Sequence, residues 1–140
     1  MIEIDPQDLA DRYVAQWTEP DATARRTAIE RLWAEDCTHI LQPPVEIREI
    51  AAGLGFDHTT LEARGHDAIE IRVERSFKRF VENGPFTFRP CSDAVRLHGV
   101  VKFRWDTVSV DTGDVAGGGL EVVVLDGDGR IKTDYSFPGA

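Results

Sequence analysis

The last third of the chain decides the fold. Residues 100–110 read VVKFRWDTVSV, residues 115–125 read VAGGGLEVVVL and residues 130–137 read RIKTDYSF, with DTGD and DGDG between them. Runs of β-branched and aromatic residues separated by short Asp/Gly clusters are typical of consecutive antiparallel hairpins. We therefore predict a three-stranded meander here, which the upstream segments must cover on one face.

Counting across the two turns predicts which side chains share a face of this sheet. A two-residue loop at 112–113 places Arg104 opposite Glu121, and one at 127–128 places Glu121 opposite Asp134. A three-residue loop or a β-bulge would reverse the assignment. The glycine run at 117–119 favours a bulge or a close approach of neighbouring chains.

The predicted sheet has two unlike faces. The polar face carries Arg104, Asp106, Glu121, Lys132 and Asp134, whereas Phe103 and Trp105 lie on the apolar one. If the polar face lines a pocket, the apolar face is left outside and requires a partner, which predicts a homodimer through the sheet. If the polar face meets water, the apolar face is simply the core. The residues leave both alternatives open.

Helical patterns dominate the first half of the chain. An N-capping Asp5-Pro6 pair starts one helix and Asp21 starts a second, and the longest helical pattern spans residues 65–83. A shorter helix is expected at 45–54, and strands at 37–41, 59–63 and 86–97, the last interrupted near Pro90. Helices collected on one side of a curled antiparallel sheet make an α+β domain that encloses a cavity.

Composition bounds the function. The 140 residues suit one domain, 1–140, and a net charge of -9 argues against nucleic-acid or acidic-membrane partners. Isolated Cys37 and Cys91 and the absence of a signal-peptide pattern predict a cytoplasmic protein. The basic residues at 72–79 alternate with glutamates, which indicates a solvated, ion-paired helix face.

No metal or cofactor is expected. His58 lies one residue from Asp57, but no third ligand follows at metal-site spacing. The glycine run at 117–119 precedes a strand instead of a helix, so it is not a phosphate-binding loop.

Several of these segments together resemble a known superfamily. They are the helix pair, the AEDCTHI strand, the GHDAI helix start and the FRW…GGGLEVVVLDGDGRI hairpin. In this order they are similar to nuclear transport factor 2-like (NTF2-like) proteins, which include SnoaL-like polyketide cyclases, ketosteroid isomerases and limonene epoxide hydrolases. The resemblance covers nearly all of the chain except residues 43–61. It implies a cone-shaped fold with a small-molecule pocket, but not a particular activity.

The resemblance to ketosteroid isomerases implies roles for three residues. Tyr13 matches the oxyanion-hole tyrosine of that family, and Glu121 falls where it keeps a protonated acid. Leu41 stands where it keeps the general base, which departs from that mechanism. In the SnoaL-like cyclases a single acid on the last strand transfers the proton, and Asp134 takes that place.

The epoxide hydrolases of this fold resemble the chain differently. Their Arg-x-Asp motif matches Arg104-Trp105-Asp106, while Asp134 falls one inward position from their second aspartate, where Ser136 stands. Their water-holding residues correspond to His39 and Leu41.

Two functions from different classes follow. The first is a dimeric, cofactor-free domain that binds a small, largely apolar molecule and performs acid-base chemistry of isomerase, cyclase or epoxide-hydrolase type. Asp134 would move the proton, Arg104 would hold or polarise the substrate and its acids, with Asp106 a further acid beside it, and Tyr13 with Glu121 would donate hydrogen bonds to a developing oxyanion. Trp17, His39 and Leu41 would line the substrate pocket. The second is a ligand-binding or structural domain without catalysis.

Overall fold

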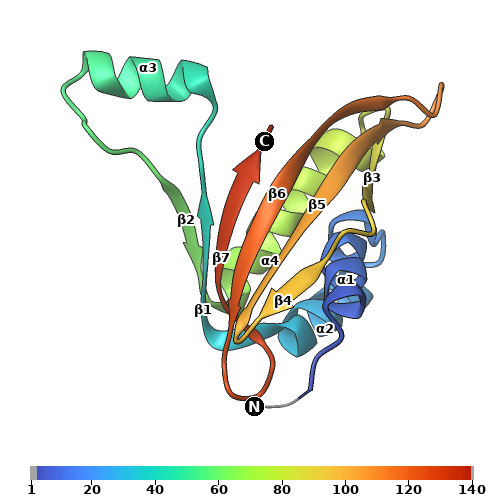
Figure 1. The fold of residues 1–140 in the computed structure, drawn as a ribbon. Helices are drawn as coiled ribbons and strands as arrows, with labels where there is room; N and C mark the ends of the chain where they lie inside the picture. Colours follow the sequence, from blue (N-terminus) through green and yellow to red (C-terminus); the bar gives the residue numbers. More distant parts are fainter. Residues whose placement is uncertain (1–2, 140) are drawn as a thin grey trace.

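A computed structural model describes residues 3–139 of the chain. The elements in chain order are α1 (Pro6–Thr18), α2 (Ala22–Leu32), β1 (Trp33–Leu41), α3 (Val45–Gly53), β2 (Leu61–Arg64), α4 (Gly65–Ser76), the π-helical turn η1 (Phe77–Glu82), β3 (Phe86–Pro90), β4 (Val95–Leu97), β5 (Val100–Ser109), β6 (Val115–Leu125) and β7 (Ile131–Pro138). Helices α1, α2 and α4 lie on one side of a curved, open seven-stranded sheet (Figure 1). This confirms the predicted α+β architecture.

Two aspartates fix where the first helices begin. Asp5 accepts a hydrogen bond from the backbone of Gln7 at 3.3 Å, and Asp21 accepts one from Ala24, also at 3.3 Å. These bonds satisfy amide groups that the first helical turn leaves without a carbonyl partner. Both helix starts are as predicted, and α1 and α2 form the expected hairpin.

The sheet runs in the order β2-β1-β7-β6-β5-β3, with β4 added beside β5. Neighbouring strands are antiparallel except for β1 and β7, which are parallel. The parallel pair brings the strand after α2 next to the last strand of the meander, and His39 is paired with Asp134. A residue from the first third of the chain therefore reaches the acids of the C-terminal third.

A bulge in β6 reverses the predicted pairing of β5. Thr107 pairs with Gly117 and Val108 with Val115, so Ala116 is the extra residue. The glycine run does provide the predicted bulge. Because a bulge moves side chains to the opposite face, Phe103 and not Arg104 pairs with Glu121.

The prediction that Arg104 and Asp106 share a face with Glu121 is therefore wrong. Arg104 is exposed, and the Asp106 carboxylate pairs with Arg89 at 3.5 Å on the outer side of the sheet. Phe103 is buried and Trp105 half-buried on the inner side.

A second irregularity turns Asp134 inward. Val124 pairs with Thr133 and Leu125 with Ile131, so Lys132 is extra. Ile131 and Asp134 are both fully buried although they are three residues apart. Glu121 pairs with Ser136 instead of Asp134, yet the two acids share the inner face as predicted.

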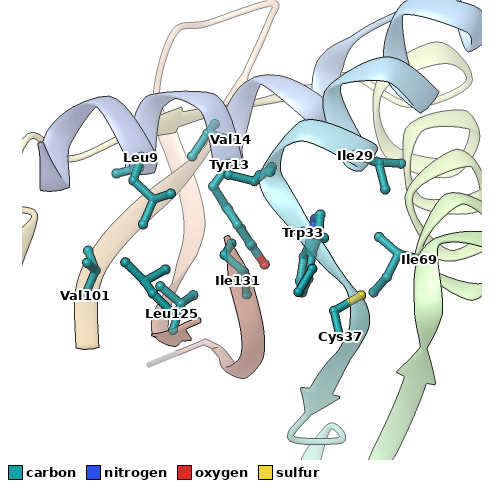
Figure 2. Close-up of a cluster of buried hydrophobic side chains, with 14 of the residues drawn as sticks. Leu9, Tyr13, Val14, Ile29, Trp33, Cys37, Ile69, Val101, Leu125 and Ile131 are labelled. Carbon is teal, nitrogen blue, oxygen red and sulfur yellow. The ribbon is translucent and has the colours of Figure 1, made fainter. Parts of the chain in front are cut away.

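The core lies between the helices and this inner face. Figure 2 shows Tyr13 reaching from α1 into a cluster of apolar side chains that come from the helices and from the sheet. Its fully or nearly fully buried members include Leu9, Ala10, Ile29, Leu32, Trp33, Cys37, Ile69, Val73, Val101, Phe103, Val123 and Ile131. Cys37 is buried in this core, whereas Cys91 is only half-buried.

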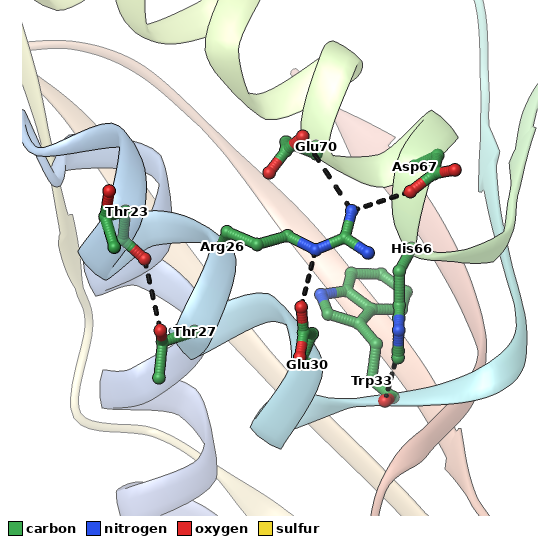
Figure 3. Close-up of polar contacts among 8 residues, drawn as sticks. All are labelled: Thr23, Arg26, Thr27, Glu30, Trp33, His66, Asp67 and Glu70. Atoms are coloured by element: carbon green, nitrogen blue, oxygen red, sulfur yellow. Dashed lines mark hydrogen bonds and ion pairs between the residues drawn. The ribbon is translucent and has the colours of Figure 1, made fainter.

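Polar contacts hold α2 against α4 at the surface. The Arg26 guanidinium lies 2.7 Å from Glu30, 2.8 Å from Asp67 and 3.8 Å from Glu70 (Figure 3). The ring of His66 contacts the Trp33 carbonyl at 2.8 Å. These contacts fix the start of α4 beside β1, and so the position of the cavity wall described below.

The segment that departs from the superfamily pattern projects from the body. Helix α3 buries no residue of its own and lies apart from the other helices (Figure 1). Its segment carries exposed apolar side chains, namely Val45, Ile47, Ile50, Leu54, Phe56 and Leu61. No helix in residues 3–139 is long and apolar enough to cross a membrane.

Candidate functional site

A cavity of about 470 Å³ opens between the inner face of the sheet and the helices. Its wall is largely aromatic and includes Trp17, Phe80, Phe86, Phe88 and Trp105. The polar side chains in its lining are few, as in most small-molecule sites. The inner face of the sheet therefore looks into a pocket, and the side chains on that face are the candidates for chemistry.

Tyr13 joins two acids at the floor of this cavity. Its hydroxyl oxygen lies 2.9 Å from Oε1 of Glu121 and 2.6 Å from Oδ2 of Asp134. All three side chains are at most 3% exposed. Tyr13 and Glu121 contact the cavity, whereas Asp134 lies behind them.

Two further donors hold the second oxygen of Glu121. The indole Nε1 of Trp105 donates to Oε2 at 2.8 Å, and the Ser136 hydroxyl donates to the same atom at 3.0 Å. An indole N–H can only donate, so Oε2 must be an acceptor. With Tyr13 included, Glu121 accepts from three side chains, an environment that favours the ionised form.

Asp134 has the opposite environment. Its Oδ2 contacts the Tyr13 hydroxyl, its Oδ1 has no partner among the described residues, and a side-chain hydrogen bond to Glu121 favours its protonated form. Burial, and then the charge of Glu121, hold the pKa of Asp134 well above its ordinary value. Burial also raises the pKa of Glu121, although its hydrogen bonds oppose that shift.

The protonation states of Tyr13, Glu121 and Asp134 follow from these environments. Burial, followed by the two carboxylates, raises the pKa of Tyr13 well above its usual value, so the phenol keeps its proton. That single proton can be donated to only one acid. The two environments therefore favour a proton on Asp134 and a charge on Glu121, with Tyr13 donating to Glu121.

His39 lies beside the trio as a neutral ring. Its Nε2 is 3.6 Å from Oδ2 of Asp134, too far for a hydrogen bond, and has no partner among the described residues. Burial, and then the charge of Arg72, lower the pKa of His39 to about 3. His39 packs edge-on against Trp33, with ring centroids 6.0 Å apart.

The same residues form the group best suited to hold a metal ion. Ligand atoms of His39, Glu121 and Asp134 all lie within 4.8 Å of one another, a cluster that the sequence did not predict. One histidine with two carboxylates suits several divalent metals. A cation here would require both carboxylates to be ionised, so its binding would displace the proton that burial favours on this pair.

The structure brings together six of the eight candidate residues. Tyr13, Trp17, His39, Leu41 and Glu121 line the cavity, and Asp134 lies beneath its floor. Arg104 and Asp106 lie outside it.

Among the cavity residues that the sequence did not predict, three bear on its chemistry. Trp105 and Ser136 were not assigned to the site, although both side chains donate hydrogen bonds to Glu121. The glycine run that predicts a bulge was the signal for Trp105. Arg72 was interpreted as part of a solvated face, but it lines the cavity and stacks over Trp17 at 5.4 Å.

Solved structures share this architecture. A proposed isomerase of the SnoaL-like family from Agrobacterium tumefaciens matches with a TM-score of 0.76 and 24% identity, over 96% of this chain and 97% of that one. The chain has the SnoaL-like, NTF2-like fold. An NTF2-like protein of unknown function from Exiguobacterium matches this fold with a TM-score of 0.60 and 19% identity, over 93% and 97% of the two chains.

A SnoaL-like protein of unknown function from Burkholderia thailandensis has the same NTF2-like fold. It matches with a TM-score of 0.58 and 15% identity, over 99% of this chain and all of that one. No protein-family model and no curated protein sequence matches the chain. The similarity therefore establishes the NTF2-like fold, and the chemistry must be argued from the site itself.

Proposed function

We propose that this protein binds a small, largely apolar molecule in the 470 Å³ cavity and moves a proton on it without a cofactor. The observation that carries the proposal is the pair of buried carboxylates joined by the Tyr13 hydroxyl beneath an aromatic wall. Acids whose environments push their pKa values apart supply a base and an acid in one site. The reaction class is isomerase, cyclase or epoxide hydrolase.

The roles of the two acids are exchanged relative to the sequence prediction, which gave the proton transfer to Asp134, because Glu121 lines the cavity and Asp134 does not. Glu121 touches the cavity and is ionised, so it takes a proton from a substrate carbon or from a water molecule. Its protonation releases the Tyr13 hydroxyl to donate to the oxyanion that develops on the substrate, and Asp134 supplies the proton that Tyr13 gives up. In an isomerisation, Glu121 returns its proton at a second carbon, and Asp134 regains its own through Tyr13.

Trp105 and Ser136 hold Glu121 in position for this transfer. Both donate to Oε2, so Oε1 remains turned towards Tyr13. Arg104 was expected to act on the substrate, but we give it no role because it lies on the face of β5 that points away from the cavity. The Agrobacterium tumefaciens protein with this fold is a proposed isomerase, and isomerisation is one of the three reaction classes considered for this chain.

The second candidate function is ligand binding without turnover. Leu41 favours it, because this cavity residue stands where the ketosteroid isomerases keep their base. The same cavity would then store or carry a ligand.

A substrate screen with matched variants tests the proposal. Unsaturated ketones and small epoxides would be offered to the wild type, Glu121→Gln, Asp134→Asn and the outer-face control Asp106→Asn. We expect turnover by the wild type and the control, and a loss of about 100-fold or more in both cavity variants. Binding without turnover in every protein would favour the second function, and full activity in Glu121→Gln would exclude Glu121 as the base.

A homodimer through the outer face of the sheet is part of the proposal. Alternation along β6 turns Leu120, Val122 and Val124 outward, and no helix within residues 3–139 covers that side of β5, β6 and β7 (Figure 1). Tyr135 on β7 is 44% exposed on the same side. A second copy would cover these apolar side chains. The two free cysteines fit a cytoplasmic location.

A further inference from the structure

A second cavity, of about 380 Å³, adjoins the first beside the α3 segment. The two share His39, Leu41, Pro44, Arg72, Ser76 and Phe80 in their walls. A ligand longer than the first cavity can therefore extend into the second without crossing a wall of the protein. The two cavities differ in chemistry, because the second is basic where the first is aromatic.

Arg72 stands at the junction of the cavities. Its guanidinium stacks over Trp17 at 5.4 Å, and it has no hydrogen bond or ion pair with any side chain in residues 3–139. Arg26 on α2, in contrast, has three carboxylates within 4.0 Å. Burial lowers the pKa of Arg72, and the charges of Tyr13 and Glu121 oppose that shift, but no described side chain lies within hydrogen-bond distance of the guanidinium. An anion at this point would supply an acceptor.

Two more arginines extend this basic strip. Arg75 and Arg79 follow at helical spacing on α4 and η1, so they lie on the same side as Arg72, and both line the second cavity. Neither has a carboxylate within 4.0 Å among the described residues, and Arg79 stacks over Phe80 at 5.2 Å. A strip of three arginines is unexpected on a chain with a net charge of -9.

The opposite wall of the second cavity is mostly apolar. Ile47 and Leu61 come from the α3 segment and its following strand, and Ala63 adds a further apolar contact. Glu62 is the acid of this lining, and its carboxylate already accepts from Arg64 and Thr60, each at 3.0 Å. The second cavity thus offers arginine donors on one side and apolar carbon on the other.

We propose that the ligand is an amphiphile with an anionic head, carboxylate or phosphate, bound by Arg72, Arg75 and Arg79. Its apolar body occupies the aromatic cavity, where Glu121 and Tyr13 reach it. This inference rests on the proposed function, because it takes the first cavity as a ligand site. It adds the substrate class, an apolar chain or ring system that carries one acidic group.

Displacement of a neutral dye, N-phenyl-1-naphthylamine, from the full chain tests this. The competitors are octanoate, octyl phosphate and octan-1-ol, which share an apolar chain and differ in the head. We expect each anion to bind about 10-fold more tightly than octan-1-ol, since a hydrogen-bonded charge contributes about 1.5–3 kcal/mol. Arg72→Met should remove most of this preference. Arg79→Met, at an exposed position, should reduce it.

The control is Lys78→Met, which removes one exposed positive charge that pairs with Glu74 at 2.9 Å. It should keep the preference for anions, which separates a local arginine site from a general effect of net charge. Equal binding of all three competitors, or an unchanged preference in both arginine variants, would overturn the inference but leave the cavity a ligand site. If the dye and all competitors fail to bind, the proposed function falls as well. A tighter fit of octyl phosphate over octanoate would identify the head as a phosphate.

Discussion

The Tyr13 hydroxyl lies 2.6 Å from Oδ2 of Asp134, although the two residues are 121 positions apart in the chain. The contact crosses from the first helix to the last strand and ends in a side chain with no exposed surface. Because the same hydroxyl also bonds Glu121, one phenol satisfies two buried acids. The stability of the fold and the chemistry of the cavity therefore depend on the same group.

Replacing Tyr13 tests this dependence. Tyr13→Phe should lower the free energy of unfolding at neutral pH by about 1–3 kcal/mol, because both acids lose a buried hydrogen bond. Urea denaturation followed by circular dichroism measures it. Tyr135→Phe, at the other tyrosine of the chain, is the matched control and should have little effect, since the Tyr135 hydroxyl has no hydrogen-bond partner among residues 3–139. Equal effects of the two substitutions would contradict the assigned hydrogen bonds.

The glycine run on β6 tests the position of Trp105. A Cβ at Gly119 would lie 2.7 Å from Cε2 of Trp105, whereas one at Gly117 would meet nothing closer than 4.0 Å. Gly119→Ala should displace the indole, break its bond to Glu121 and cost about 1–3 kcal/mol. Gly117→Ala should stay within about 0.5 kcal/mol of the wild type. Thermal unfolding and tryptophan fluorescence would distinguish them, and a harmless Gly119→Ala would show that Trp105 is not held against the strand.

His39 should make the free energy of unfolding depend on pH below neutrality. In the unfolded chain His39 binds a proton below about pH 6.5, whereas in the folded protein burial lowers its pKa to about 3. The unfolded state therefore binds more protons between these values, and stability is lost as the pH falls through that window. The slope is at most about 1.4 kcal/mol per pH unit for one group.

His39→Gln should flatten this part of the profile. Urea denaturation of both proteins at several pH values from 7 to 4 provides the comparison. A slope in His39→Gln identical to the wild type would mean that the folded ring titrates like a free one.

The outer face of the sheet should hold two copies together. Val122→Lys places a charge among the outward apolar side chains of β6 and should produce a monomer in size-exclusion chromatography with light scattering. Val110→Lys, at a 64% exposed position beside the hairpin turn, should leave the dimer intact. A wild-type protein that is monomeric at micromolar concentration would contradict the dimer.

The sequence predicted the elements better than their register. Helix starts at Asp5 and Asp21 and the hairpins of the C-terminal third depend on local chemistry that a single sequence displays. The side of the sheet on which each β5 side chain lies depends on one extra residue, Ala116. Ala116 stands next to the glycine run at 117–119, where several strand registers are sterically acceptable. Which register wins is decided by packing of Phe103 and Trp105, and this is a tertiary effect.

The site was predictable where a family pattern covered it. Tyr13 came from that resemblance, whereas counting across the turns had already placed Glu121 and Asp134 on one face, and the three meet in the structure. Arg72 could not be found this way, because an arginine between glutamates on a helix has the pattern of a solvated surface. Only the position of α4 against Trp17 shows that it faces a cavity.

The protonation of Asp134 tests the central claim most directly. Selective ¹³C labelling of aspartate carboxyl groups allows each to be followed by NMR as the pH is changed, and Asp134→Asn assigns the relevant signal. We predict one aspartate signal that keeps its protonated shift at neutral pH and is absent from Asp134→Asn. If every aspartate is ionised at neutral pH, the two buried acids do not share a proton through Tyr13, and the proposed proton transfer is wrong.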